Sequence, residues 1–151
     1  MATNIDLDMV MQPAEVALAN MEQVLDRTAD SVDGADYLPA GMKLGLMAMV
    51  AAGKANVDGA RLMKQEVADY AKASIDANIS AAKASMTAKS LDDAVSVQRD
   101  HLQAVMHGGM AESGKLAEMA LAISEKAAAP LRKQMGTQME GPWTAWFKAA
   151  A

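Results

Sequence analysis

The chain has 151 residues, enough for one domain, and its composition is 52% hydrophobic but only 3% aromatic. Its net charge of −5 gives nucleic-acid binding no general electrostatic support, and its lack of cysteine excludes disulfides and thiolate metal sites. Much of the apolar share is alanine. Because alanine favours helix but buries little area, we expect the chain to associate with itself or with an apolar surface.

The first 41 residues are predicted to form an acidic arm. Residues 1–12 have no clear period and are predicted to be disordered. Region 13–41 is predicted to hold a short acidic helix, from Pro13 to about Thr28, and then a linker. Residues 1–41 carry eight acids and only Arg27 as a base, a net charge of −7. We interpret them as a solvated arm, with an electrostatic docking site as the alternative.

The opening residues, MATNIDLD, lack the basic start and apolar core of a signal peptide. The longest uncharged apolar run, residues 44–53, is half of the ~20 residues that a spanning helix needs. The sequence therefore predicts a cytoplasmic protein without a membrane span.

Residues 42–88 are predicted to form one long helix, because they contain no proline and their polar residues recur at steps of three and four. Gly53 and Gly59 weaken it and allow a bend. The tripeptide Ala-Lys-Ser then interrupts the pattern. Ser90 is a good N-cap, and Asp93 three residues later completes the signature of a capping box with the shorter acid.

A second long helix is predicted from Leu91 to about Ala128, with a heptad-like apolar stripe typical of a left-handed coiled coil. Gly108, Gly109 and Gly114 interrupt its middle, either as a hinge or as points of close helix packing. Pro130 is expected to end or kink this helix.

The centre of the chain resembles a phasin, a small helical protein that coats polyhydroxyalkanoate granules in bacteria. The resemblance runs from about Ala40 to Met135. It rests on residues 70–72 (Tyr-Ala-Lys), 81–83 (Ala-Ala-Lys) and 88–94 (Ala-Lys-Ser-Leu-Asp-Asp-Ala), on Gln98, and on the Ala-Asn at 55–56 and the Ala-Pro-Leu at 129–131. The glycines of the second helix and the aromatic tail depart from the family pattern.

The predicted contact residues are apolar residues at helical spacing along both long helices. The predicted seam for oligomer or polymer contact comprises Val50, Val57, Met63, Val67, Ile75, Ile79, Met86, Leu91, Val95, Leu102, Val105, Leu116, Ile123 and Leu131. The tail, residues 138–151, holds Trp143, Trp146 and Phe147, which one helical turn would align. These aromatics either cap the bundle or anchor the chain to a surface.

Catalysis has no basis in this sequence, which shows no nucleophile elbow, phosphate-binding loop or dinucleotide fingerprint. His101 and His107 are six residues apart and do not share a helix face, so no metal site within one helix is expected. We predict that the chain is not an enzyme and binds no cofactor or metal.

The predicted fold is all-α, with long amphipathic helices forming a helical hairpin or coiled-coil bundle that oligomerises. The phasin-like helical domain is expected to span residues 42–137. The resemblance to phasins implies a non-catalytic coat on the surface of a polyester storage granule, which controls granule size and separation. The alternative is a soluble coiled-coil scaffold or regulator that never touches polymer.

Overall fold

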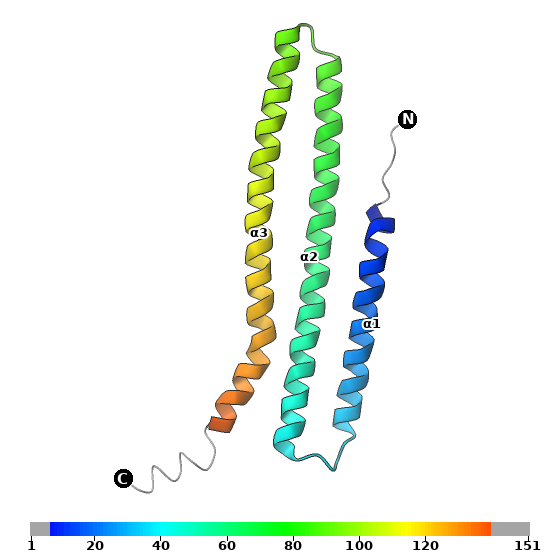
Figure 1. Ribbon diagram of the computed structural model, residues 1–151, viewed down its shortest axis with the longest axis vertical. Helices are drawn as coiled ribbons and strands as arrows, with labels where there is room; N and C mark the ends of the chain where they lie inside the picture. Colours follow the sequence, from blue (N-terminus) through cyan, green and yellow to red (C-terminus); the bar gives the residue numbers. More distant parts are fainter. Residues whose placement is uncertain (1–6, 140–151) are drawn as a thin grey trace, which may run out of the picture. The chain divides into compact units, whose positions relative to one another are not determined.

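The computed structural model describes residues 7–139 of the chain, and the side chains of residues 9–136. Three helices follow one another: α1 (Leu7–Asp33), α2 (Ala40–Met86) and α3 (Leu91–Met139) (Figure 1). Within residues 7–139 there is no strand, so the prediction of an all-α fold is confirmed.

Helix α1 is longer than the sequence indicated. It begins at Leu7, whereas we expected disorder up to residue 12, and it ends at Asp33 rather than near Thr28. Pro13 therefore lies inside the helix and not at its first position. A proline has no N–H to donate to the residue four positions earlier. Pro13 is the seventh residue of α1, so it lies past the first turn and leaves the carbonyl of Met9 without this hydrogen bond.

The connection between α1 and α2 is shorter than the predicted linker, because α2 begins at Ala40 and takes in residues that we expected to be linker. The backbone N–H groups of Met42 and Lys43 both donate to the carbonyl of Pro39, which starts the helix. Nζ of Lys43 lies 2.5 Å from the carbonyl oxygen of Asp33, the last residue of α1. A lysine at this place satisfies an unpaired carbonyl and complements the negative end of the helix dipole.

The break between α2 and α3 lies where the sequence predicted it. Helix α2 ends at Met86, and α3 begins at Leu91. The backbone N–H of Asp93 donates to Oγ of Ser90 over 3.1 Å, so the prediction that Ser90 is an N-cap is confirmed.

Pro130 does not end α3, which continues to Met139. Figure 1 shows a bend in the orange part of α3, toward its C-terminal end, and a proline inside a helix is a common cause of such a bend. The segment beyond the bend still lies beside α2. Nε2 of Gln134 donates to the carbonyl of Gly41 over 3.4 Å, and Ala127 is buried.

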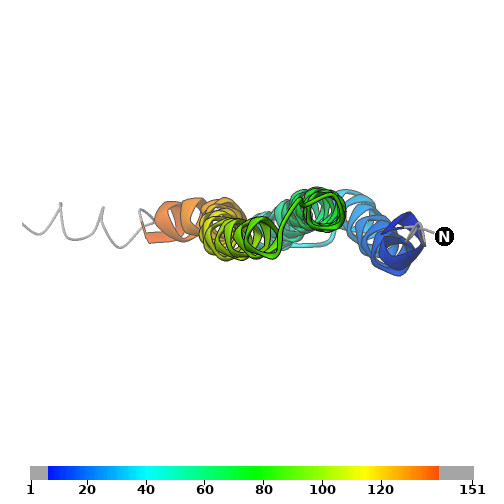
Figure 2. The same cartoon turned by 90° about the horizontal axis from the view of Figure 1, so that it is seen from above.

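The chain divides into two compact units. Of the described residues, the three-helix unit comprises residues 7–61 and 120–139, and the hairpin unit comprises residues 62–119. In the three-helix unit, α2 lies between α1 and the last part of α3 (Figures 1 and 2). All the buried hydrophobic residues of the described chain belong to this unit; they are Val32, Ala35, Val50, Ala52, Val57 and Ala127.

Candidate surface-binding face

The two helices of the hairpin unit meet through polar side chains. Nε2 of Gln98 donates to Oγ of Ser85 over 2.7 Å. One turn further from the break, Nε2 of His101 lies 2.8 Å from Oδ1 of Asn78. None of residues 62–119 is buried, so these contacts lie in a half-open seam.

An ion pair marks the other end of this seam. Nζ of Lys115 contacts the carboxylate of Glu66, whose side chain is 22% exposed. The hydrogen bond to Glu66 and its charge raise the pKa of Lys115. Along these three contacts the residue number falls on α2, from 85 to 78 to 66, while it rises on α3, from 98 to 101 to 115. The two helices therefore run antiparallel. The contacts also define which side of each helix is covered.

The apolar side chains of this unit lie together on one side of the seam. Successive residues of a helix turn by about 100°. In an antiparallel pair of helices, take a residue of each helix that contacts the other helix. The next residue along the chain then lies on the same side of the pair, whichever helix it belongs to. Two of the six contact residues, Gln98 and Lys115, are followed by Arg99 and by the half-buried Leu116. The other four are followed by exposed apolar residues, which are Val67, Ile79, Met86 and Leu102. We call these four residues the apolar face of the hairpin unit.

The apolar face is open to solvent. The exposed fraction is 86% for Met86 and 62% for Leu102. On α3 the face is extended by residues about one to three turns from Leu102; they are Leu91, Val95, Met106 and, at its edge, Met110 and Val105, all exposed. The opposite side of the pair differs. Asp100 directly precedes His101, and Asp69 directly precedes Tyr70, whose Oη would lie 3.6 Å from a Cβ at Gly109 of α3. The hairpin unit is therefore amphipathic as a whole.

The predicted contact residues fall into three groups in the structure. Val50 and Val57 are buried, and Met63, Ile75, Leu116 and Ile123 are half-buried. The exposed ones are Val67, Ile79, Met86, Leu91, Val95, Leu102, Val105 and Leu131. The predicted anchor, Trp143, Trp146 and Phe147, lies outside the described residues, as does the rest of the tail after Met139.

The first half of α3 does not turn its apolar stripe toward α2. The half-buried residues there are Ala94, Val97, His101, Gly108, Gly109 and Glu112. Ala94 and His101 directly precede Val95 and Leu102 of the predicted stripe, and one position is a rotation of about 100°. The matching side of α2 carries Asn78 and Ser85, which hydrogen-bond to α3. Small and polar residues thus fill the seam, and the apolar stripe stays uncovered within the chain.

Helix α1 covers an apolar stripe of α2 in the three-helix unit. A Cβ added to Gly53 would lie 2.6 Å from Cδ2 of Leu25, so the two helices approach closely there. Val50 and Val57 flank Gly53 by three and four residues, on the same face of α2. Their exposed fractions are 6% and 2%, so this is the best-packed part of the helix.

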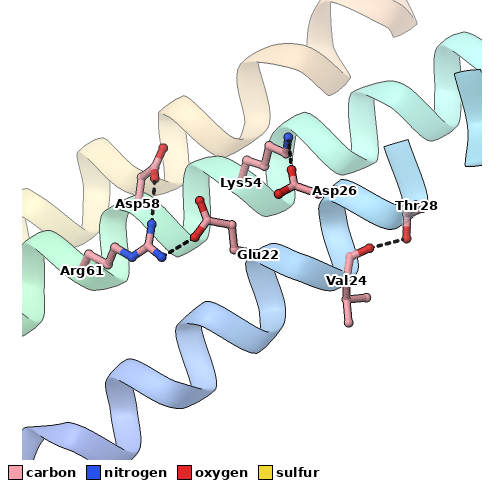
Figure 3. Close-up of polar contacts among 7 residues, drawn as sticks. All are labelled: Glu22, Val24, Asp26, Thr28, Lys54, Asp58 and Arg61. Atoms are coloured by element: carbon pink, nitrogen blue, oxygen red, sulfur yellow. Dashed lines mark hydrogen bonds and ion pairs between the residues drawn. The ribbon is translucent and has the colours of Figure 1, made fainter. Parts of the chain in front are cut away.

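Ion pairs join α1 to α2 along the edge of that contact (Figure 3). Nζ of Lys54 lies 2.6 Å from Oδ1 of Asp26, and this hydrogen bond raises the pKa of Lys54. Arg61 pairs with Glu22, and the hydrogen bond and charge of Arg61 lower the pKa of Glu22. The hydrogen bond to Glu22 likewise raises the pKa of Arg61. Sequence reasoning missed these pairs, although the acidic excess of residues 1–41 was their signal.

The described residues offer no site for metal chemistry. Within that part of the chain, no group of three histidine, aspartate or glutamate side chains could hold an ion. Nor is any of the described helices long and apolar enough to cross a membrane. His107 is exposed beside Met106 and Met110 on the outer surface of α3.

The fold and this face together define an amphipathic helical hairpin preceded by an acidic covering helix. A family model described as "Phasin protein" matches residues 40–135, and the chain belongs to this family. The match begins with the first residue of α2 and takes in most of α3, whereas α1 lies before it. Searches of curated proteins and of solved structures found no match.

Proposed function

We propose that the protein is a non-catalytic coat of polyhydroxyalkanoate granules in the bacterial cytoplasm, and that it binds the polymer through the apolar face of the hairpin unit. The observation that carries this proposal is the open apolar face, with Leu102 62% exposed and Met86 86% exposed. Membership in the phasin family supports a granule surface as the partner.

The binding energy comes from apolar area removed from water. Moving a large aliphatic side chain from water to an apolar surface gains up to ~1.5–3 kcal/mol when it is fully covered. The face needs no rearrangement of the seam, because Ser85 and Asn78 keep their partners on α3. Its exposed side chains can therefore meet a flat surface while the hairpin stays folded.

The opposite side of the hairpin would face the cytoplasm. It carries charged residues such as Asp69 and Asp100, and the chain as a whole has a net charge of −5. A layer of like charge repels other coated granules and keeps them small and separate. In the absence of polymer, the same apolar face would cover that of a second copy, so self-association and granule binding compete.

A pair of charge substitutions tests the face. Ile79→Asp with Leu102→Asp places two carboxylates on it. The matched control, Ala77→Asp with Ala104→Asp, adds the same charge at exposed positions away from it. We expect the first pair to abolish the fluorescent rings that a labelled copy forms around granules in polyester-accumulating cells, and the control pair to leave them.

The same cells separate the coat from the alternative, a coiled-coil scaffold that never binds polymer. Diffuse fluorescence of the unsubstituted protein in granule-rich cells would reject the proposed function. Circular dichroism of each purified variant must first show that its helix content is unchanged. Equal loss of rings in both variant pairs would show that added charge, and not the apolar face, governs binding.

A further inference from the structure

We infer that α1 is a displaceable cover, and that the α2 stripe beneath it, formed by Val50, Gly53 and Val57, is a second polymer-binding surface that α1 occupies in the free protein. This inference rests on the proposed function, because it takes the same polyester surface as the partner. It adds a surface that the apolar face of the hairpin unit does not include, and it assigns a role to the acidic arm.

The first support is the register of α2. Eighteen residues make five turns of a helix, so residues eighteen apart share a face. Ile75 lies eighteen residues after Val57 and therefore shares its face of α2. Met86 lies thirty-six residues after Val50 and likewise shares its face. In the helix register, the stripe under α1 is therefore repeated by Ile75 and Met86 in the second half of α2. Val57 is 2% exposed, whereas Met86 is 86% exposed.

The second support is that α1 is separable from the family unit. The family match begins at Ala40, where α2 begins. The covalent connection of α1 to it is the six-residue turn 34–39. The contacts of α2 with α3, such as that between Gly59 and Ile123, involve no residue of α1. Departure of α1 would leave them in place.

The third support is the chemistry of the contact. Its polar part consists of ion pairs at the rim, in which the side chains of Lys54 and Asp26 are 45% and 55% exposed. Such pairs are individually weak and are screened by salt. Its apolar part is Leu25 against Gly53 and its neighbours, which a polymer surface can replace. The acidic helix thus holds the stripe closed in water without forming a deep core around it.

Helix α1 also carries apolar residues that its contact with α2 does not use. Val10, Met21 and Val24 are 65%, 53% and 61% exposed. Their spacing places them along one side of the helix, next to the contact residues. A released α1 would therefore remain amphipathic and could lie on the same polymer surface.

A glycine substitution tests the cover without changing the apolar character of the stripe. In Gly53→Ala the new Cβ would lie 2.6 Å from Cδ2 of Leu25, so the end of this side chain must turn away, and its packing of α1 on α2 weakens. Gly114→Ala is the control, because a Cβ there meets nothing within 4 Å. We expect Gly53→Ala to adsorb severalfold more tightly to protein-free polyhydroxybutyrate particles, and Gly114→Ala to adsorb like the unsubstituted protein. Adding Leu25→Ala, which removes the clashing methyl groups, should return Gly53→Ala toward the original affinity.

A crosslink tests the opposite direction. The chain has no cysteine, so Asp26→Cys with Lys54→Cys supplies a single pair of thiols across the contact. Joining them with a short cleavable bis-maleimide locks α1 closed. We expect adsorption to weaken about tenfold or more, because the open fraction limits the apparent affinity of this stripe. Cleavage of the linker should restore it.

The outcomes separate this inference from the proposed function. If the unsubstituted protein does not adsorb, the proposed function fails and the cover has no partner. If it adsorbs and the locked and Gly53→Ala proteins adsorb equally well, the apolar face alone binds and the cover is refuted. If Gly53→Ala instead forms a dimer in sedimentation and adsorbs as before, the stripe serves self-association and the inference is overturned.

Discussion

The two units of this chain use their helices in opposite ways. In the three-helix unit, glycines let helices approach until side chains such as Val57 are 2% exposed. In the hairpin unit, hydrogen bonds such as that between Asn78 and His101 hold the helices, and none of residues 62–119 is buried. The first arrangement stabilises the fold. The arrangement of the hairpin unit buries little apolar surface within the chain, so that surface stays available to a partner.

The glycines show this contrast directly. A Cβ at Gly59 would lie 2.6 Å from Cγ2 of Ile123, whereas a Cβ at Gly108 would meet nothing within 4 Å. At Gly109 the nearest atom, Oη of Tyr70, would be 3.6 Å away, which is ordinary contact. Close packing therefore explains Gly59, and it does not explain Gly108.

The largest expected effect comes from the same charge placed in each unit. Val57→Asp puts a carboxylate at a position that is 2% exposed, and the nearest cations on that face, Lys54 and Arg61, already pair with Asp26 and Glu22. We expect a loss of about 3 kcal/mol or more in the free energy of unfolding. Leu102→Asp, at a position 62% exposed, should change it by about 0.5 kcal/mol or less. Urea unfolding followed by circular dichroism measures both, and equal losses would break the comparison.

Alanine at the two kinds of glycine should change stability with opposite sign. Gly59→Ala should destabilise by about 1–3 kcal/mol, because Ile123 is β-branched and its rotamer in a helix is restricted, so it cannot turn aside. Gly108→Ala should stabilise by about 1 kcal/mol, because alanine is the better helix former and has room. Thermal melting of the two variants gives the sign, and stabilisation by Gly59→Ala would contradict the close approach.

A smaller effect is expected from the polar seam. Replacing both Asn78 and His101 by alanine in a double-mutant cycle should give a coupling of about 0.5–1 kcal/mol, at the low end for hydrogen bonds, because both groups lie in a half-open seam. Pairing Asn78→Ala with Lys89→Ala, outside this contact, should give none. A coupling of zero in the first cycle would leave the seam without its proposed support.

The smallest effect concerns pH. Because Arg61 lowers the pKa of Glu22 in the folded chain, their pairing stabilises α1 at any pH above the pKa of an unfolded glutamate. This stabilisation is lost as pH falls from there through the folded value. The protection of α1 amides from hydrogen exchange, corrected for the intrinsic pH dependence of exchange, should therefore fall toward acidic pH, and Glu22→Gln should flatten that dependence. An unchanged pH profile in Glu22→Gln would remove this pair from the contact.

Local features of the chain were predictable from the sequence. The helical periods, the break before Leu91 and the N-cap at Ser90 depend on residues within a few positions of one another, and the structure confirms the cap. The extent of α1 was not predictable from Pro13 alone, because a proline can begin a helix or interrupt one.

The choice of contact faces depended on the tertiary structure. Helix α3 has both an apolar stripe with Leu102 and a neighbouring face with His101, and either satisfies the helical period. Which one meets α2 depends on the shape and hydrogen-bonding groups of the partner helix, here Asn78 and Ser85. Likewise the sequence placed an acidic excess before residue 42, but only the fold brings Glu22 to Arg61 and Leu25 to Gly53. Periodicity is a property of one helix, whereas a contact requires two helices to be complementary.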